Sequence, residues 1–403
     1  MAAAARTIAW TGEGAARRTT RAARRRGTLG AIVNLRRREV APDLVLDDGR
    51  LALTADADLT DPLLTLRCAR VAAEHDAYLQ RGSLERLADN APVLSDPWPD
   101  EAREMFVALL ATGPSAIPVI EDLDHVGLFV QLVPEWEPCR SRPQRNAYHR
   151  FTVDRHLMEA AAEASRLVDR VDRPDLLLVG ALFHDIGKGY PGDHTEVGVD
   201  LLQTIATRMG FDADDVETLV AMVQHHLLLP DVATRRDLDD DGTIASVADA
   251  VRSSRLLPLL GALTEADSIA TGPSAWSSWK GGLVNELVSR VSHVLAGGDV
   301  GEVVGGSFPD AEQRLLLEDG SFLVRGEGRT LTVVAADRTG TFSKVAGVLS
   351  LNGADVLGAS AHSENGRALS VFRVGSAPDG DPDWTRIADQ IRLALAGRLA
   401  LSA

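Results

Sequence analysis

Apolar residues recur every three or four positions along most of the chain, which is the pattern of amphipathic helices. The pattern begins in "DPLLTLRCARVAAEHD", at residue 61, and continues in further segments to about residue 136. We therefore predict a small helical domain over residues 41–140, with no chemistry of its own. Residues 1–40 are rich in Arg, Ala and Gly without a sustained period, so we expect a disordered or non-native basic start.

A second helical block follows, and the residues that break helices divide it into segments of ordinary length. Pro174 is expected to begin one helix, Gly210 to end another, and Pro230 to stop a third. The predicted helices include "DRHLMEAAAEASRLVDRV", "PDLLLVGALFHDIGKG", "ADDVETLVAMVQHHLLL" and "RLLPLLGALTEADSIATG". We predict an all-helical domain over residues 141–300.

The pattern changes after a glycine-rich segment, Gly297–Gly306, which we interpret as a hinge. "RTLTVVAADR" and "ALSVFRVG" have the β-branched clustering of strands, and "GTFSKVAGVLSLNG" has the period of a helix. "ADVLGASAHSENG" is predicted as a strand and "PDWTRIADQIRLALAGRL" as a final helix. The order β-α-β-β-α describes a small α+β unit over residues 328–403.

Charge and composition exclude some function classes. The net charge of −16 over 403 residues disfavours binding to nucleic acid or to anionic lipid. No apolar run is long enough to cross a bilayer, and no secretion signal opens the chain, so we expect no membrane partner. Two cysteines, Cys68 and Cys139, cannot build a disulfide framework, which favours a cytoplasmic protein.

The segment "GALFHDIGKGYPGDHTEVG" places His184 and Asp185 side by side at the end of an apolar run. Neighbours on a helix point about 100° apart, so the two side chains can flank one metal ion. Unpaired polar groups are costly inside apolar helices, and a shared divalent cation would explain several of them together. The other candidate ligands are His156, His194, His225, His226 and Asp267.

Each candidate also has a structural interpretation. A single histidine on an apolar face is more often a hydrogen-bonded core residue, and Asp267 alone is compatible with a helix cap or an arginine partner. His225 and His226 face different directions, so at least one of them is compatible with a purely structural role. The ordered set His156, His184-Asp185 and Asp267 favours the metal hypothesis, with His194 and His226 as a second group.

These residues carry a resemblance to a known family. The order of the four ligands is similar to that of the HD superfamily of metal-dependent phosphohydrolases, which are all-helical. "ALFHDIGKGYPGDHTEVG", "HHLLLPDVATRRDL" and "LTEADSIATGPSAWSSWK" resemble the C-terminal part of the bifunctional uridylyltransferase/uridylyl-removing enzymes that modify the nitrogen regulatory protein PII. The likeness extends from about residue 41 to the end of the chain.

The resemblance implies hydrolysis of the phosphodiester that joins UMP or AMP to PII, with one or two divalent ions, Mn or Mg first and Fe or Zn as alternatives. His156, His184, Asp185 and Asp267 would hold one ion, and His194 with His226 would help to hold a second. Asp185 and Lys188 are the expected catalytic residues, with Lys188 neutralising charge on the phosphoryl oxygens. Arg235 and Arg236 are expected to contact a phosphate or PII, or else to form solvated salt bridges.

The C-terminal unit resembles an ACT domain, a ferredoxin-like sensor of small molecules. Asp337 and the glycine turn at Gly340 match its ligand-binding end, and the resemblance implies glutamine as an effector. A plain packing unit is the alternative. The expected fold is therefore mainly α, with a small helical domain, an all-helical HD domain and a C-terminal α+β ACT domain.

The chain also departs from the family. Its full-length members begin with a nucleotidyltransferase domain marked by Gly-Ser followed by Asp-x-Asp, and neither "DADLTD" nor "DLDDDG" follows such a turn. We therefore expect no transferase activity. Two alternative functions remain open: another HD phosphohydrolase that acts on a nucleotide or an alarmone, and a non-catalytic fragment that binds PII.

Overall fold

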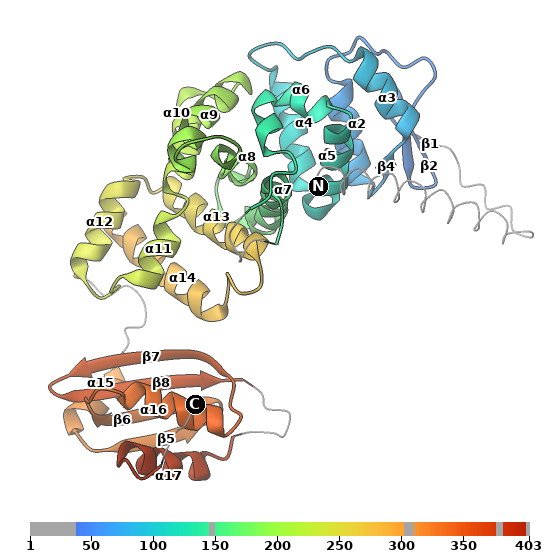
Figure 1. Cartoon of the computed structure of the whole chain (residues 1–403). Helices are drawn as coiled ribbons and strands as arrows, with labels where there is room; N and C mark the ends of the chain where they lie inside the picture. Colours follow the sequence, from blue (N-terminus) through green and yellow to red (C-terminus); the bar gives the residue numbers. More distant parts are fainter. Residues whose placement is uncertain (1–37, 145–149, 302–308, 310, 376–381, 400–403) are drawn as a thin grey trace, which may run out of the picture. The chain divides into compact units, whose positions relative to one another are not determined.

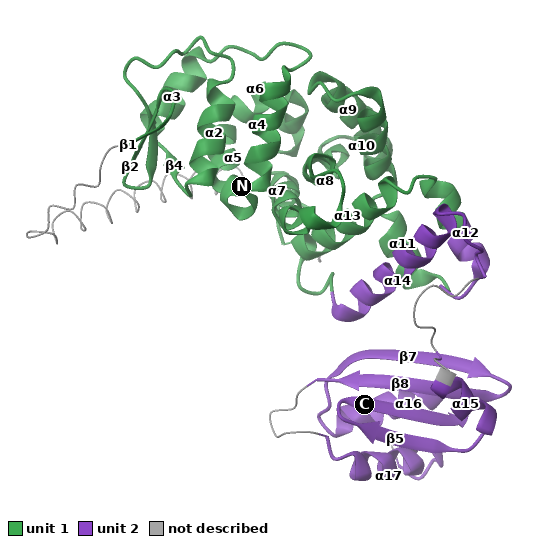
Figure 2. Cartoon of the chain, turned by 180° about the vertical axis from the view of Figure 1, so that it is seen from behind, with its two compact units in different colours: residues 1–237, 246–276 green, residues 238–245, 277–403 purple. Residues whose placement is uncertain are grey.

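The computed structural model describes residues 38–144, 150–301, 309, 311–375 and 382–399 (Figure 1). Residues 1–37 of the predicted basic start, and residues 302–306 of the predicted hinge, lie outside this part of the chain. The chain divides into two compact units, one with residues 1–237 and 246–276 and the other with residues 238–245 and 277–403 (Figure 2). The predicted boundaries of the HD domain, 141–300, stay a prediction.

The described part of the first unit opens with a small β-sheet, so the prediction of a purely helical domain over residues 41–140 is wrong in its first part. Strands β1, β2 and β3 pair antiparallel, and β3 pairs parallel with the short β4. Asp48 and Gly49 both adopt positive φ (55° and 70°) between β2 and β3, as a tight hairpin turn requires. The strands are β1 Arg38–Ala41, β2 Leu44–Asp47, β3 Arg50–Leu53 and β4 Tyr78–Leu79.

Helices form the rest of the first unit, as predicted. They are α2 Leu64–Glu74, α3 Arg81–Asn90, α4 Asp100–Ala111, η1 Gly113–Ser115, α5 Ala116–His125, α6 Leu128–Leu132, η2 Pro134–Cys139, α7 Val153–Ala164, η3 Ser165–Arg170, α8 Pro174–Phe183, η4 Ile186–Gly189, α9 His194–Arg208, α10 Ala213–His225, α11 Leu228–Arg235 and α13 Leu256–Thr271. Helix α12, Asp241–Val251, runs across the division between the units, and α14, Ser278–Leu295, belongs to the second unit.

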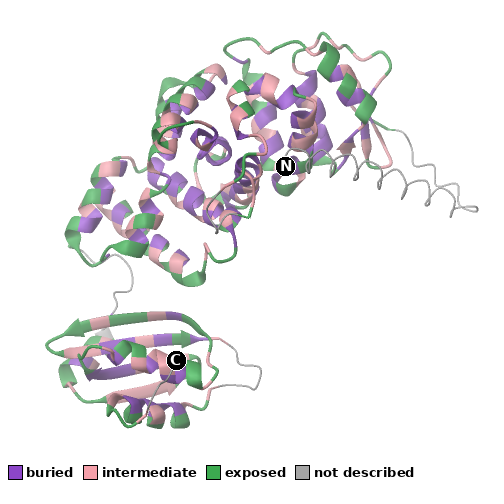
Figure 3. Ribbon diagram, viewed as in Figure 1, coloured by how far each residue is buried: buried purple, intermediate pink, exposed green. Residues whose placement is uncertain are grey.

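Helix α8 is the central element of the helical block. Every residue from Leu176 to Phe183 is buried, so this helix is apolar on all sides (Figure 3). It packs against α7, α10 and α13, which surround it. A helix that is hydrophobic all round has no solvent face, so the residues that follow it begin inside the protein.

Two of the three predicted helix breaks are confirmed. Pro174 occupies the first position of α8, and Gly210 has a φ of 77° just after α9. Pro230 does not stop the helix before it: α10 already ends at His225, and Pro230 lies in the first turn of α11. Proline is tolerated there because the first helical N–H groups have no intrahelical acceptor.

The second unit contains a four-stranded antiparallel sheet with the order β5-β6-β8-β7. Alternate residues of β6 enter two cores: Leu331 and Val333 pack with α16 and α17, whereas Val334 packs with Leu317 of α15. The predicted order β-α-β-β-α is found, and β5 and α15 add to it. The elements are α15 Ala311–Asp319, β5 Leu323–Glu327, β6 Thr330–Ala336, α16 Thr341–Leu351, β7 Val356–Glu364, β8 Arg367–Val374 and α17 Trp384–Leu395.

Among the described residues, no single helix is long and apolar enough to cross a membrane; the pair Asp100–Ala111 and Gly113–His125, bent by 109°, meets the length and composition criterion only when taken together. Both cysteines are buried and free, so Cys68 and Cys139 form no disulfide. Burial raises the pKa of each thiol to about 12, which keeps both in the unreactive thiol form.

Candidate metal centre

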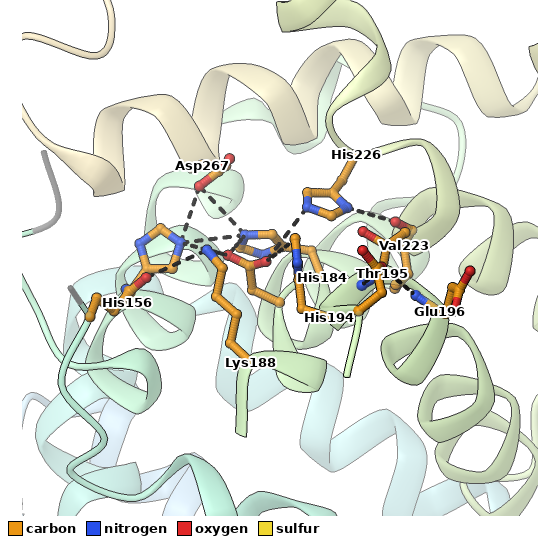
Figure 4. A network of polar contacts seen from close by, with 12 residues as sticks. His156, His184, Lys188, His194, Thr195, Glu196, Val223, His226 and Asp267 are labelled. Carbon is orange, nitrogen blue, oxygen red and sulfur yellow. Dashed lines mark hydrogen bonds and ion pairs between the residues drawn. The ribbon is translucent and has the colours of Figure 1, made fainter. Parts of the chain in front are cut away.

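The six residues predicted as metal ligands converge on one place in the first unit (Figure 4). They come from six elements or element ends that are spread over more than a hundred positions of the chain. The residues are His156 in α7, His184 after α8, Asp185 before η4, His194 at the start of α9, His226 after α10 and Asp267 in α13.

His184 and His226 are held in the same way, each just after the last residue of a helix. The Nδ1 of His184 lies 2.9 Å from the carbonyl oxygen of Ala181, and the Nδ1 of His226 lies 2.6 Å from that of Val223. A carbonyl can only accept, so each Nδ1 carries the proton and donates it. Each Nε2 is therefore the ring nitrogen that faces the cluster, and a metal bound there would displace any proton that it carries.

The first group of ligand atoms surrounds the Nε2 of His156. This nitrogen lies 3.1 Å from Oδ1 of Asp267, 3.4 Å from Nε2 of His184 and 3.6 Å from Oδ2 of Asp185. The Nε2 of His184 lies 3.4 Å from both Asp267 Oδ1 and Asp185 Oδ2. Ligands about 2.1 Å from one cation are roughly 3.0–3.4 Å from each other in octahedral or tetrahedral geometry, so this group fits a single ion.

The second group meets the other oxygen of Asp185. Its Oδ1 lies 3.5 Å from Nε2 of His226 and 3.7 Å from Nε2 of His194. Asp193 caps α9 by accepting the N–H groups of Thr195 and Glu196, and this fixes the turn that presents His194. Asp185 is thus common to both groups, one oxygen to each.

His225 and His226 do face different directions, as predicted. His226 is buried in the cluster, whereas His225 lines a separate pocket of about 760 Å³ beside α10. Burial lowers the pKa of His225, which is therefore neutral near pH 7. His225 is not a member of the cluster.

The charges in the cluster are strongly coupled. Burial opposes ionisation of His184, but the carboxylates of Asp185 and Asp267 outweigh burial and raise its pKa to about 10. Burial also disfavours the charged forms of both carboxylates, and the attraction of His184 outweighs it, so both carboxyl pKa values lie well below the usual range. Burial lowers the pKa of His194, which leaves that imidazole neutral.

The donor set fits a divalent cation. The carboxylates of Asp185, which is buried, and Asp267, which is 20% exposed, lie close together among imidazoles, and a divalent cation would balance their charge. In addition, Oδ1 of Asp185 and Nε2 of His226 are buried, and neither makes a hydrogen bond within the described part of the chain. Buried polar atoms without partners are rare and indicate an absent water or ion.

Three side chains of the centre remain partly exposed. Lys188, Asp267 and His194 keep 25%, 20% and 31% of their side chains exposed. The remaining candidate ligands, His156, His184, Asp185 and His226, are almost fully buried. The Nζ of Lys188 contacts Oδ2 of Asp185 and also donates to Oε1 of Gln144 at 3.4 Å. Gln144 was missed in the sequence analysis, since nothing in its local sequence distinguishes it.

The remaining predicted site residues lie elsewhere. Arg235 pairs with Asp231 at an exposed position of α11, at 3.6 Å, and Arg236 is exposed after the same helix. None of the contacts formed by the described residues joins either arginine to the cluster. Asp337 and Gly340 belong to the second unit, where Gly340 has a φ of 87° and forms the expected turn before α16. Their roles in binding stay predictions.

Comparison with known proteins agrees with this centre. The sequence profile described as "HD domain" matches residues 153–253, which hold all of the candidate ligands except Asp267. Bifunctional uridylyltransferase/uridylyl-removing enzymes are 48% identical in Streptomyces coelicolor (326 residues, 78% of this chain and 39% of the relative) and 41% in Mycobacterium tuberculosis (405 residues, 98% and 50%). The relative in Corynebacterium glutamicum is 34% identical over 75% of this chain and 43% of its own length.

The chain thus spans half or less of the length of these curated relatives. An HD domain that carries a candidate metal centre, together with homology over most of the chain, places the protein in the family of bifunctional uridylyltransferase/uridylyl-removing enzymes.

Proposed function

We propose that this chain catalyses the metal-dependent hydrolysis of the phosphodiester between a nucleotide, UMP or AMP, and the PII protein. One observation carries the proposal: the ligand atoms of His156, His184, Asp185 and Asp267 lie 3.1–3.6 Å from their neighbours. The names of the relatives include a uridylyl-removing activity, and we propose the same activity for this chain.

His156, His184, Asp185 and Asp267 would hold one cation, Mn²⁺ or Mg²⁺ in the first place, and Asp185 with His194 and His226 would hold a second. A divalent cation in such a site lowers the pKa of water toward neutrality and neutralises charge on phosphoryl oxygens. Protonated Nδ1 atoms on His184 and His226 keep both imidazoles oriented, so the site needs little reorganisation when substrate arrives.

Lys188 is the proposed contact for the substrate phosphate. It is one of the most exposed side chains of the centre, and its ammonium already lies against Oδ2 of Asp185. An anionic phosphodiester approaching from that side meets a positive charge that is held in place by Asp185 and Gln144. Transition-state charge on the phosphoryl oxygens is stabilised most by groups that are positioned in advance.

We further propose PII as the protein partner and glutamine as an effector. Arg235 and Arg236 are exposed cations that can pair with a phosphate or with acidic residues of PII. For glutamine, the turn from Asp337 to Gly340 before α16 offers the amides of a helix start to a carboxylate.

Lys188→Met is expected to lower the rate of hydrolysis by about a hundredfold, because the side chain keeps its length and loses the charge that faces phosphate. Metal content, measured by inductively coupled plasma mass spectrometry, should stay unchanged, since Lys188 is not a ligand. Lys188→Arg is the matched control and should retain part of the rate. Equal rates for Lys188→Met and the wild type would remove Lys188 from the mechanism.

The function is tested by incubating the chain with Mn²⁺ and either uridylylated or adenylylated PII, with and without glutamine, followed by mass spectrometry of PII. Loss of the nucleotide from one form is the expected result, and it also identifies the base. A parallel incubation with an alarmone separates the two hydrolase functions. If the metal-loaded chain leaves both forms of PII intact, the proposed substrate is wrong.

A further inference from the structure

The short helix η4, which follows Asp185 and carries Lys188, lies against the first turn of α9 with no space between the two backbones. A Cβ atom added at Gly187 would lie 2.0 Å from the carbonyl oxygen of His194 and 2.8 Å from the amide nitrogen of Gly198. Both distances are far below the optimum of roughly 3.5 Å for heavy atoms. The neighbours are backbone atoms, so no side-chain rotation can relieve the contact.

The contact between η4 and α9 has a glycine in each element, Gly187 in η4 and Gly198 in α9. A Cβ at Gly198 would lie 3.7 Å from the amide nitrogen of Gly187 and 3.0 Å from Cγ1 of Val223 in α10. Gly187 is not among the glycines with positive φ, so conformational freedom does not explain it. Close approach of two backbones is the remaining requirement that only glycine meets.

The contact has a chemical consequence, because each side of it carries a ligand. Asp185 immediately precedes η4, and His194 is the first residue of α9. We propose that Gly187 is a positioning residue: by carrying no side chain it brings α9 close enough for His194 to share a cation with Asp185 and His226. This inference rests on the metal-dependent function proposed above.

On the side away from α9, hydrogen bonds hold the η4 segment in place. A side chain added at Gly187 would therefore move α9 and not η4. Cys139 donates its thiol hydrogen to the carbonyl of Ile186 at 3.3 Å, and the hydroxyl of Tyr190 donates to the carbonyl of Glu135 at 3.2 Å. Residues 191–193, which lead into α9, are all exposed. A methyl group at Gly187 therefore displaces the first turn of α9 and leaves η4 in place.

The displacement separates the two groups of ligands. Oδ1 of Asp185 and Nε2 of His194 are 3.7 Å apart, the longest of the distances given above between two candidate ligand atoms. The distance from a metal ion to each of its ligands tolerates a change of only about 0.2 Å. His156, His184 and Asp267 contact one another from α7, the end of α8 and α13, so a shift of α9 leaves these mutual contacts in place. Gly187→Ala should therefore weaken the His194 half of the centre selectively.

The test compares four proteins by isothermal titration with Mn²⁺ and by metal content: wild type, Gly187→Ala, His194→Ala and Gly82→Ala. Gly82 lies in α3 with open space around its Cβ position, so it controls for a glycine substitution in the same unit. We expect Gly187→Ala and His194→Ala to lose at least about tenfold in affinity for the same Mn²⁺ equivalent, and Gly82→Ala to match the wild type. Wild-type Mn²⁺ binding by Gly187→Ala, with His194→Ala impaired, overturns the positioning role alone.

Two further measurements separate a loss of the positioning role from misfolding and from a failure of the proposed function. If circular dichroism shows that Gly187→Ala has lost helical content, Gly198→Ala decides the question, because its clash is with a side chain and is milder. Weaker binding of the same Mn²⁺ equivalent supports the role, and unchanged binding overturns it. A wild-type chain that takes up no Mn²⁺ would overturn the proposed function itself.

Discussion

Asp185→Asn is expected to lower phosphodiester hydrolysis by at least about a thousandfold, which corresponds to about 4 kcal/mol of transition-state stabilisation. Asp185 is the one carboxylate with an oxygen in each ligand group, facing His156 and His184 with Oδ2 and His194 and His226 with Oδ1. Asparagine keeps the shape but removes the charge, so the group with His194 and His226 loses its carboxylate and the group with His156 and His184 keeps only that of Asp267. Initial rates with nucleotidylated PII measure the loss.

His225→Ala is the matched control, since His225 adjoins a ligand in sequence but lies outside the cluster. It should retain wild-type turnover, whereas His184→Ala should be as inactive as Asp185→Asn. Helical content, measured by circular dichroism, should be largely unchanged in all three variants. Retained turnover in Asp185→Asn or His184→Ala would contradict the assignment of the active centre.

Removal of the metal is expected to abolish hydrolysis and to lower the melting temperature by about 5–10 °C relative to protein with Mn²⁺ at a hundred times its dissociation constant. Ligand binding at that ratio stabilises the folded state by about 2.7 kcal/mol, and each kcal/mol shifts Tm by roughly 2–4 °C in a domain of this size. Differential scanning fluorimetry with EDTA and then with added Mn²⁺ measures the shift.

The variant Asp185→Asn serves as the control for that experiment, because Mn²⁺ should no longer change its melting temperature. The protein without metal should still be folded, because the buried core of the first unit consists mainly of apolar side chains outside the centre. An identical Tm for the wild type with EDTA and with Mn²⁺ would show that the centre holds no cation.

Local sequence signals predicted most of the helices and the strands of the C-terminal unit. The N-terminal sheet was missed because its three antiparallel strands have only four residues each, too few for a clear alternation. The signal that could have found them is Asp48-Gly49 between "LVLD" and "RLAL", a dipeptide typical of a two-residue hairpin turn. The end of α10 was also predicted wrongly. We expected the helix to stop at Pro230, but it ends at His225, and Pro230 is accommodated in the first turn of α11.

For the centre, the types of residue in the sequence indicated the candidate ligands, but the sequence did not give their positions in space. Buried His and Asp in apolar helices are costly without a shared partner, so the sequence alone marked six ligands that the structure brings together. It did not mark Gln144 beside Lys188, and it favoured His226 over His225 only through the resemblance to the family. The structure distinguishes the two histidines, because adjacent side chains at the end of α10 point in different directions and only that of His226 enters the cluster.

Residue type and order were enough to predict the helical class of the first unit, the chemistry of the candidate ligands and the membership of the family. Only the tertiary structure decided that Asp185 joins two groups of ligands and that α9 approaches η4 closely enough for His194 to take part. Both features depend on how closely α9, α10 and the residues around η4 approach one another in space. Such distances are set by packing, and packing is a property of all the neighbours at once.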